Sequence, residues 1–360
     1  MKQLFAPCIS ILVLLFVCSV SAQAQSKNKK DSLIENRCVQ SLRDAEKTYE
    51  AGRINEVEGM VLPCIRNEGF SKFEKLQAYR LIILSKLFDN REEEANQYFM
   101  EMIKTDPEYK ANPVTDPSEY INLFNSYRTN PIFAIGIKAG MNFTTPNAFV
   151  PYGVYNTGGS TGTYKASLNA QFGVNADVYL NKKFSLGADL LLSFKKFQYK
   201  NILLDYSELT AKETQMWLEL PVVLKYTMGQ KKTRFYLQGG GAISMLFSAK
   251  SNIIRKETNT QSNEAIGPDV NMMSMRNKFN YSLIGGAGVR YKAGYGYVVL
   301  DVKYMYGLNN ISNPDKKYSN SDLIYKYGYI DNNFTLNSLM FSVGYYKSFY
   351  KPKKIPTHEK

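Results

Sequence analysis

The chain has 360 residues, and its 45 Lys and Arg against 32 Asp and Glu give a formal net charge of +13. It contains 27 Tyr and 20 Phe but a single histidine, His358, which leaves almost no material for His-based catalysis or a His-rich metal site. Hydrophobic residues make up 44%, too many for a disordered chain, and no long apolar run follows the first residues. These features disfavour most hydrolases, metalloenzymes and helical membrane proteins, and leave a soluble β protein or a β-barrel.

The first residues have the order of a secretory signal peptide. Lys2 precedes an apolar run over residues 4–20, and small residues follow, so we expect residues 1–24 to be cleaved and the mature chain to lie outside the inner membrane. The alternative is a retained membrane anchor, for which this run is short. Cleavage leaves two of the four cysteines, Cys38 and Cys64.

Residues 25–130 predict a helical domain. Apolar residues recur at helical spacing on both sides of a break at 51–53, and antiparallel packing of the two helices would bring Cys38 and Cys64 level. A disulfide is expected in an oxidising compartment, and two buried thiols are the alternative. A second hairpin breaks at 89–91, and a last helix over 117–127 follows Asp116 as its predicted cap.

The two hairpin breaks are 38 residues apart, which is close to the period of about 34 residues in tetratricopeptide repeats. The resemblance to these repeats lies in the arrangement and not in a clear Trp, Gly and Tyr motif. Stacked helical repeats usually offer a concave surface to a peptide or a partner helix. We therefore expect residues 25–130 to bind a periplasmic protein partner, and the alternative is a compact helical cap without a partner.

After Pro131 the apolar spacing changes from helical to strict alternation, in eight segments. Short links at 181–182, 229–232 and 293–294 alternate with long polar links, which lie at 144–167, 201–212, 251–276 and 309–332. The pattern is typical of outer-membrane barrels with tight periplasmic turns and long outer loops. Residues 131–350 thus predict an eight-stranded antiparallel transmembrane β-barrel, followed by a basic tail at 351–360. A soluble ligand-binding barrel of the lipocalin type is the alternative.

The predicted fold class is therefore α + β multidomain, with the helical domain before the barrel. Because both ends of the barrel segment lie on the short-turn side, we expect the helical domain in the periplasm and the barrel in the outer membrane. Charged residues alternate with the large apolar ones, so they are predicted to face the lumen; they are Lys138, Asp177, Asp189, Lys195, Glu219, Lys225, Arg234, Arg290, Asp301 and Lys303. Eight strands enclose a lumen that side chains fill, so these charges are expected to pair.

We interpret this ion network as structural, with a catalytic or transport role as the alternative. Glu219 and Lys225 flank Pro221 and are the pair expected to matter most. Pro221 cannot donate to the strand ladder and is predicted to mark a bulge or kink.

Residues 217–226, Trp-Leu-Glu-Leu-Pro-Val-Val-Leu-Lys-Tyr, resemble the "YLEIPLLLKY" strand of the PorT-like outer-membrane β-barrel family of Bacteroidota. Residues 136–142 and 235–241 are similar to other stretches of that family, and the resemblance covers roughly residues 132–350. Trp217 stands where Tyr is usual, and the lysine-rich tail replaces a terminal aromatic residue. The resemblance implies a setting such as the type IX secretion and gliding apparatus.

The sequence predicts no enzyme, no cofactor and no metal site. Without an available imidazole no Ser-His-Asp triad can form, and no phosphate-cradling Gly-rich loop precedes a helix. The positive charge is interpreted as attraction to outer-membrane lipid and lipopolysaccharide and not to nucleic acid, with a solubilising surface as the alternative. The predicted function is a barrel that anchors a periplasmic docking domain. The alternative is a ligand-binding or transport protein that acts through its long outer loops.

Overall fold

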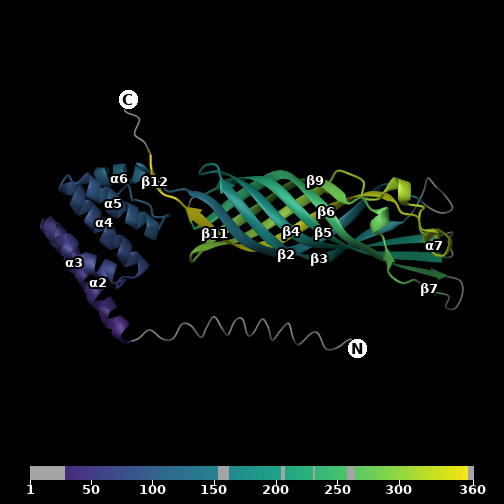
Figure 1. Ribbon diagram of the computed structural model, residues 1–360, viewed down its shortest axis with the longest axis horizontal. Coiled ribbons are helices and arrows are strands. Elements are labelled where there is room, and N and C mark those ends of the chain that lie inside the picture. The colour runs from purple at the N-terminus through teal and green to yellow at the C-terminus, as the bar shows by residue number, and fades with distance from the viewer. Residues whose placement is uncertain (1–28, 153–161, 204–206, 230–231, 258–263, 356–360) are drawn as a thin grey trace, which may run out of the picture. The chain divides into compact units, whose positions relative to one another are not determined.

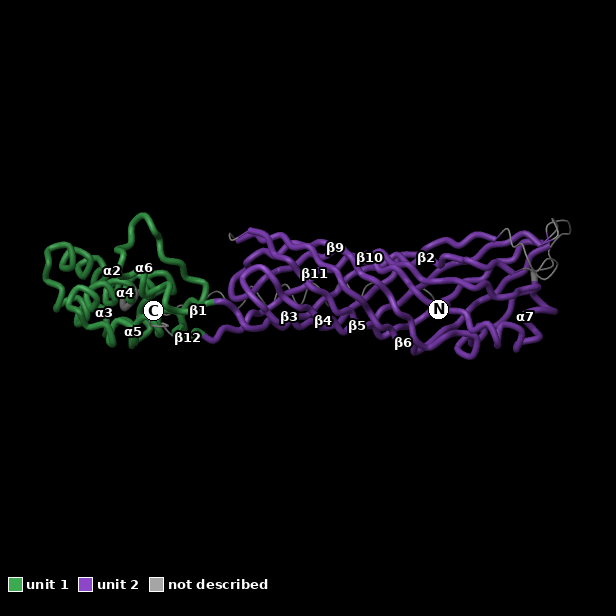
Figure 2. The backbone as a smooth tube through the Cα atoms, turned by 90° about the horizontal axis from the view of Figure 1, so that it is seen from above, with its two compact units in different colours: residues 1–129, 352–360 green, residues 130–351 purple. Residues whose placement is uncertain are grey.

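The structure is a computed structural model that describes residues 29–152, 162–203, 207–229, 232–257 and 264–355 (Figure 1). The described chain divides into two compact units, one of residues 29–129 with 352–355 and one within residues 130–351 (Figure 2). The predicted signal peptide lies outside the described residues. No helix in the described part of the chain is both long and apolar enough to cross a membrane.

The first unit is built on a stack of helices with its own apolar core. Their bounds are α2 (Lys29–Glu50), α3 (Ile54–Arg66), α4 (Lys72–Phe88), α5 (Glu92–Thr105) and α6 (Ser118–Asn125). Helix α4 is the central one: Ala78, Ile82 and Ile83 are fully buried, and α4 packs against both α3 and α5. It begins with a capping box between Ser71 and Glu74, which fixes its first turn.

The two helical hairpins have the same turn, 38 residues apart. Gly52 and Asn90 both adopt positive φ, at 79° and 54°. The next residue donates its backbone N–H five residues back in each case, Arg53 to Thr48 O at 3.1 Å and Arg91 to Lys86 O at 2.8 Å. The chain therefore repeats its helix-turn-helix geometry as well as its spacing.

The predicted cap of the last helix is wrong. Helix α6 has Pro117 at its N-cap and no side-chain cap, and Asp116 is instead buried. Its carboxylate accepts from the Arg80 guanidinium at 2.6 Å and from the backbone N–H of Asn112 at 2.7 Å. A buried carboxylate gains more from a guanidinium partner than from an exposed helix end, so the long-range ion pair prevails.

The C-terminal segment returns to the helical unit. Lys353 and Lys354 form β12 (Lys353–Lys354), which pairs with β1 (Tyr127–Arg128), and Ile355 donates its backbone N–H to Ser126 O at 2.7 Å. Part of the basic tail is thus a strand. A two-residue strand carries no periodicity, so the sequence had no signal for it.

In the second unit eight described strands close a ring, β2-β3-β4-β5-β6-β9-β10-β11 and back to β2, every pair antiparallel (Figure 1). Their bounds are β2 (Pro131–Val150), β3 (Thr163–Tyr179), β4 (Phe184–Leu203), β5 (Ser207–Met228), β6 (Thr233–Glu257), β9 (Phe279–Ala293), β10 (Gly296–Gly307) and β11 (Asn333–Tyr350). Short strands β7 (Glu264–Ile266) and β8 (Val270–Asn271) each pair antiparallel with β6. The predicted eight-stranded antiparallel barrel is confirmed.

The strands run further than the sequence predicted. Residues 201–212, predicted as a long polar link, belong mostly to β4 and β5, because Leu203, Leu209 and Ala211 continue the inward, buried face. The link 309–332 is also structured, with η3 (Pro314–Lys316) and α7 (Ser321–Tyr325). These strand ends reach beyond the band of apolar residues on the outer surface of the barrel. Their outward residues are therefore mostly polar, and the strict alternation that predicts a strand is lost there.

Pro221 marks no register shift. It lies opposite Ala242 of β6 in an unbroken register, and the irregularity of this pair falls between Met216 and Trp217. On the β4 side the pairing passes from Leu191–Glu219 to Ala188–Val222, so the ladder is interrupted at Pro221, which lacks an N–H, but the register is kept without an extra residue.

Candidate functional site: a filled barrel lumen

Buried ion pairs cross the barrel lumen. We call the barrel end with the short connections after residues 179, 228 and 293 the turn end, and the opposite end the loop end. Lys303 of β10 binds Asp189 of β4 at 2.5 Å, and in the ring these two strands lie opposite each other. Lys138 of β2 binds both Asp189 and Asp301 of β10, with Nζ–O distances of 3.0 Å and 2.6 Å. These four residues form the first cluster.

A second cluster centres on Asp177. This fully buried carboxylate of β3 accepts from Lys225 of β5 at 2.7 Å and from Arg290 of β9 at 2.7 Å. Strands β3 and β9 are again opposite in the ring, so the cluster spans the lumen. A charge this deeply buried is stable only when it is paired, and each cluster pairs its charges across the barrel.

The third pair differs from the prediction. Glu219 binds Lys195 of β4 at 2.6 Å and accepts from the Ser193 hydroxyl at 2.6 Å, whereas Lys225 belongs to the Asp177 cluster. Glu219 and Lys225 therefore do not pair with each other. Six residues along a strand separate them by roughly 20 Å, which no side chain bridges.

Arg234 differs from the other predicted residues in being half-buried. Its guanidinium carbon lies 5.3 Å from the centre of the Tyr297 ring. Each of the other predicted charged residues is less than 9% exposed. Arg234 is therefore the one among them that lies in a partly open environment.

Inward-facing glycines make room for these pairs. A Cβ on Gly187 would come within 2.6 Å of Asp177 Oδ1 and 2.7 Å of Lys225 Cε. A Cβ on Gly288 would meet the Tyr236 ring at 2.4 Å and Asp301 Oδ1 at 2.7 Å. Glycine at these strand positions leaves the space that the large ionic side chains fill.

The lumen also contains apolar layers, which corrects the expectation of a polar interior. One layer consists of Leu191, Val223, Ala242, Ile284, Met305 and Met340. A larger one fills the loop-end half and includes Trp217, Leu246, Ile311, Tyr329 and Phe334. Because an eight-stranded lumen is just wide enough for side chains to fill it, apolar residues can pack there as in a protein core.

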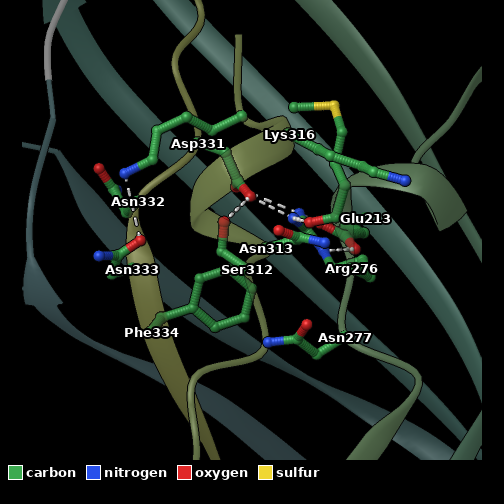
Figure 3. A network of polar contacts seen from close by, with 12 residues as sticks. Glu213, Arg276, Asn277, Ser312, Asn313, Lys316, Asp331, Asn332, Asn333 and Phe334 are labelled. Atoms are coloured by element: carbon green, nitrogen blue, oxygen red, sulfur yellow. Dashed lines mark hydrogen bonds and ion pairs between the residues drawn. The ribbon is translucent and has the colours of Figure 1, made fainter. Parts of the chain in front are cut away.

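A buried cluster joins the loop-end segments to the barrel wall (Figure 3). Arg276, in the link after β6, donates to Glu213 of β5 through Nε at 2.9 Å and Nη2 at 2.6 Å. It also donates to Asp331, which precedes β11 and accepts from the Ser312 hydroxyl at 2.6 Å. We call Glu213, Arg276, Ser312 and Asp331 the loop-end cluster; it ties two long links to the wall.

Sequence reasoning missed the loop-end cluster because its residues lie in segments assigned to loops or to the link before the fourth strand. A signal was present for one of them. Glu219 and Trp217 face inward at every second position of their strand. Continuing this alternation towards the N-terminus reaches Gln215 and then Glu213. Nothing in the sequence pattern identifies Arg276 and Asp331 as partners, because their contact depends on how the links fold back.

In the helical unit, Cys38 and Cys64 form a disulfide with a Cα–Cα distance of 5.6 Å. Pro63 lies inside α3 without preventing this contact. The bond joins α2 to α3 across the first hairpin.

Replacing both cysteines by serine is expected to destabilise the helical unit by about 3 kcal/mol, since the bond closes a loop of 26 residues in the unfolded chain. Urea unfolding of the full chain, followed by the helical circular dichroism signal, measures the loss. Reduction of the wild-type protein should reproduce it. An unchanged helical transition in both would show that the bond contributes nothing to stability.

A buried lysine organises acidic side chains on α3 and α5. Lys86 Nζ binds Glu58 at 2.6 Å and Glu94 at 2.5 Å, and Tyr98 donates its hydroxyl to Glu58. Burial alone would raise the pKa of Glu58, but the hydrogen bonds from Lys86 and Tyr98 outweigh it and hold that pKa below the ordinary value. Burial and the Glu58 carboxylate raise the pKa of Tyr98 to about 12.

Because the pKa of Glu58 is lowered in the folded state, its contribution to stability is present at neutral pH and is lost as pH falls through that pKa. Glu58→Gln is therefore expected to destabilise the helical unit at pH 7 and to match the wild type in acid. Urea unfolding at several pH values measures the difference. Glu93→Gln is the control, because Glu93 is exposed and has no ion pair among the described residues; an equal effect there would contradict the assignment.

Within the described residues, no cluster of three His, Cys, Asp or Glu side chains could hold a metal ion. The carboxylates of the lumen are instead held by lysine and arginine. The ion pairs of the lumen can therefore block the barrel interior and stabilise its wall.

Several solved structures are similar to the chain at low sequence identity. Solved structures that resemble the chain include Neisserial surface protein A (11% identity, TM-score 0.27, 60% of this chain and 97% of that one) and the attachment invasion locus protein Ail of Yersinia pestis (12%, 0.24, 59% and 97%). The outer membrane protease OmpT of Escherichia coli is a third (8%, 0.26, 62% and 98%). No match was found among curated proteins.

The family assignment rests on sequence. Residues 125–313, a little over half of the chain, match the family described as "Outer membrane protein beta-barrel domain". This match covers most of the ring of strands and implies location in the outer membrane. The chain therefore belongs to the outer membrane protein beta-barrel domain family.

Proposed function

We propose that the protein anchors a helical docking unit at the periplasmic side of the outer membrane, where that unit binds a protein partner of an envelope or secretion assembly. The observation that carries the proposal is the repeated helix-turn-helix geometry, in which Arg53 and Arg91 make the same backbone hydrogen bond at the two turns. Repeated helical hairpins of this kind commonly present a binding surface. The resemblance of residues 217–226 to the PorT-like family favours a type IX-like secretion assembly as the setting.

The disulfide supports a location outside the cytoplasm, because such bonds persist in oxidising compartments. Both ends of the barrel segment, Pro131 and Tyr350, pair with each other at the turn end. In outer-membrane barrels the tight turns face the periplasm, so this topology favours a periplasmic helical unit.

The competing function is ligand capture or transport at the loop end. Transport through the lumen is disfavoured, because the Asp189 and Asp177 clusters cross it and apolar layers fill it. Ligand capture on the outer surface of the loops is compatible with a filled lumen and is the alternative that the experiment must separate.

Site-specific photo-crosslinking in the native cell tests the proposal. A photoreactive amino acid placed at Phe73 or at Phe88, whose side chains are 69% and 72% exposed, should form a covalent product with a periplasmic protein. The matched position at the loop end is Tyr318, which is 52% exposed and should give no such product. Crosslinks at Tyr318 alone would support ligand capture instead.

Deletion of residues 29–125 gives a second readout. The barrel should still form, because its ring of strands closes without the helices. Loss of the cellular phenotype with an intact barrel supports docking, whereas full activity of the truncated protein contradicts it.

A further inference from the structure

A row of lysines follows the apolar band on the outer surface of four adjacent strands. Outward residues of β4 run from Leu192 and Phe194 directly to Lys196. In β5 and β6 one polar residue, Thr214 or Ser248, stands between the last outward apolar residue and the lysine. The lysines are Lys165 of β3, Lys196 of β4, Lys212 of β5 and Lys250 of β6, and all four are exposed. We call these four residues the lysine row.

Strand register brings the lysine row together. Lys196 pairs with Thr214, and Thr214 pairs with Lys250 on its other side, so the two lysines lie two strands apart. At about 4.8 Å per strand their backbones are roughly 10 Å apart. Lys212 lies two residues from Thr214 on the same face of β5, between the other two strands. Long, flexible stems let these three ammonium groups converge on one anionic head group.

The charge in this row is uncompensated. None of the four lysines has an ion pair within the described residues, in contrast to Lys200, which lies nearby and binds Glu208 at 2.8 Å. The equivalent outward positions of β2 and β11 hold Thr145, Asn147 and Asn337, which carry no charge. The β2–β11 side of the barrel therefore lacks the positive charge that the lysine row gives to the β3–β6 side.

The apolar band, which consists of the outward apolar side chains of the strands, lies directly next to the lysine row. Phe172 of β3 and Phe194 of β4 are in ring contact, with centroids 6.3 Å apart, and Phe247 of β6 is 49% exposed. A ligand that touches both the band and the row must have acyl chains and an anionic head group. Free phosphate has no apolar part to contact the aromatic surface, and a peptide or a nucleic acid would have to displace lipid from the apolar band to reach it.

We propose that the lysine row binds the phosphate groups of lipopolysaccharide, whose acyl chains lie against Phe172, Phe194 and Phe247. Ammonium groups near a membrane surface bind anionic lipid head groups, and several phosphates on one molecule match several adjacent lysines. The assignment rests on the proposed orientation, in which the loop end faces outward, because lipopolysaccharide occupies the outer leaflet.

Binding of purified diphosphoryl lipid A to the full chain in detergent micelles, followed by native mass spectrometry, tests the assignment. The triple variant Lys196→Gln, Lys212→Gln and Lys250→Gln is expected to bind about 100-fold more weakly, if each lysine near the surface contributes the usual amount. The matched control, Lys182→Gln, Lys183→Gln and Lys232→Gln, removes the same charge from exposed residues at the turn end and should bind like the wild type.

Further arms separate the sources of the anion. The triple variant Lys196→Arg, Lys212→Arg and Lys250→Arg should retain binding, and dephosphorylated lipid A should not bind to the wild type. Wild-type affinity in the glutamine triple variant, or complete displacement of lipid A by millimolar inorganic phosphate, would overturn the assignment. The assay needs neither a protein partner nor a membrane orientation, so a negative result would leave the docking proposal standing.

Discussion

Replacing Lys195 by Met is expected to lower the free energy of unfolding of the barrel by about 3–5 kcal/mol, the usual cost of breaking a buried ion pair from one side. The Glu219 carboxylate is completely buried and would lose the ammonium group at 2.6 Å. The Ser193 hydroxyl would remain as its hydrogen-bond donor, which is too little to hold a charge in the lumen. Urea unfolding of the protein folded into lipid vesicles measures the loss.

The double variant Lys195→Met with Glu219→Met sharpens this test. Removing both charges leaves no buried ion unpaired, so most of the lost stability should return. The exposed pair of Lys200 and Glu208 provides the control: their side chains are 44% and 42% exposed, and Lys200→Met should cost less than about 1 kcal/mol. Equal costs for Lys195→Met and Lys200→Met would mean that water reaches Glu219 and that the lumen is not filled.

Replacing Arg276 by Met is expected to release the links at the loop end. Both Glu213 and Asp331 would lose their guanidinium partner while buried, at a cost of at least about 3–5 kcal/mol to the packing of those links. Hydrogen exchange of residues 310–331 should increase strongly, while exchange at the turn end should stay as in the wild type.

A control and a rescue accompany the Arg276 variant. Lys278→Met changes an exposed residue two positions along the chain and should leave exchange unchanged. The neutral triple variant Arg276→Met, Glu213→Gln and Asp331→Asn removes the unpaired charges and should restore part of the protection. If Arg276→Met alone leaves residues 310–331 protected, the apolar layer around Phe334 holds the links without the loop-end cluster.

Alternation alone was enough to predict the ring of strands. Outward positions such as Phe133, Leu237 and Phe341 must contact lipid, so an apolar residue stands at every second position and the pattern is visible in one sequence. The helical hairpins were predictable for a similar reason, since the breaks at Gly52 and Asn90 separate helical periods. Both signals are local.

Partner choice inside the lumen could not be predicted in the same way. Asp177 binds residues of β5 and β9, neither of which is its sequence neighbour, and only ring closure brings them together. Inward apolar residues such as Leu191 and Val223 were missed because, where both faces of a strand are apolar, alternation no longer distinguishes them. The lysine row depends on the register of four strands and was equally invisible.

Labelling of single cysteines in intact cells tests the central claim, that an outer-membrane barrel with its loop end outside carries the helical unit in the periplasm. Cysteine replaces Lys316 at the loop end, Lys182 at the turn end or Glu93 on α5, all exposed positions. A membrane-impermeant maleimide should label position 316 in intact cells, and positions 182 and 93 only after the outer membrane is permeabilised. Labelling of position 182 or 93 in intact cells, or protection of 316, would contradict the proposed topology.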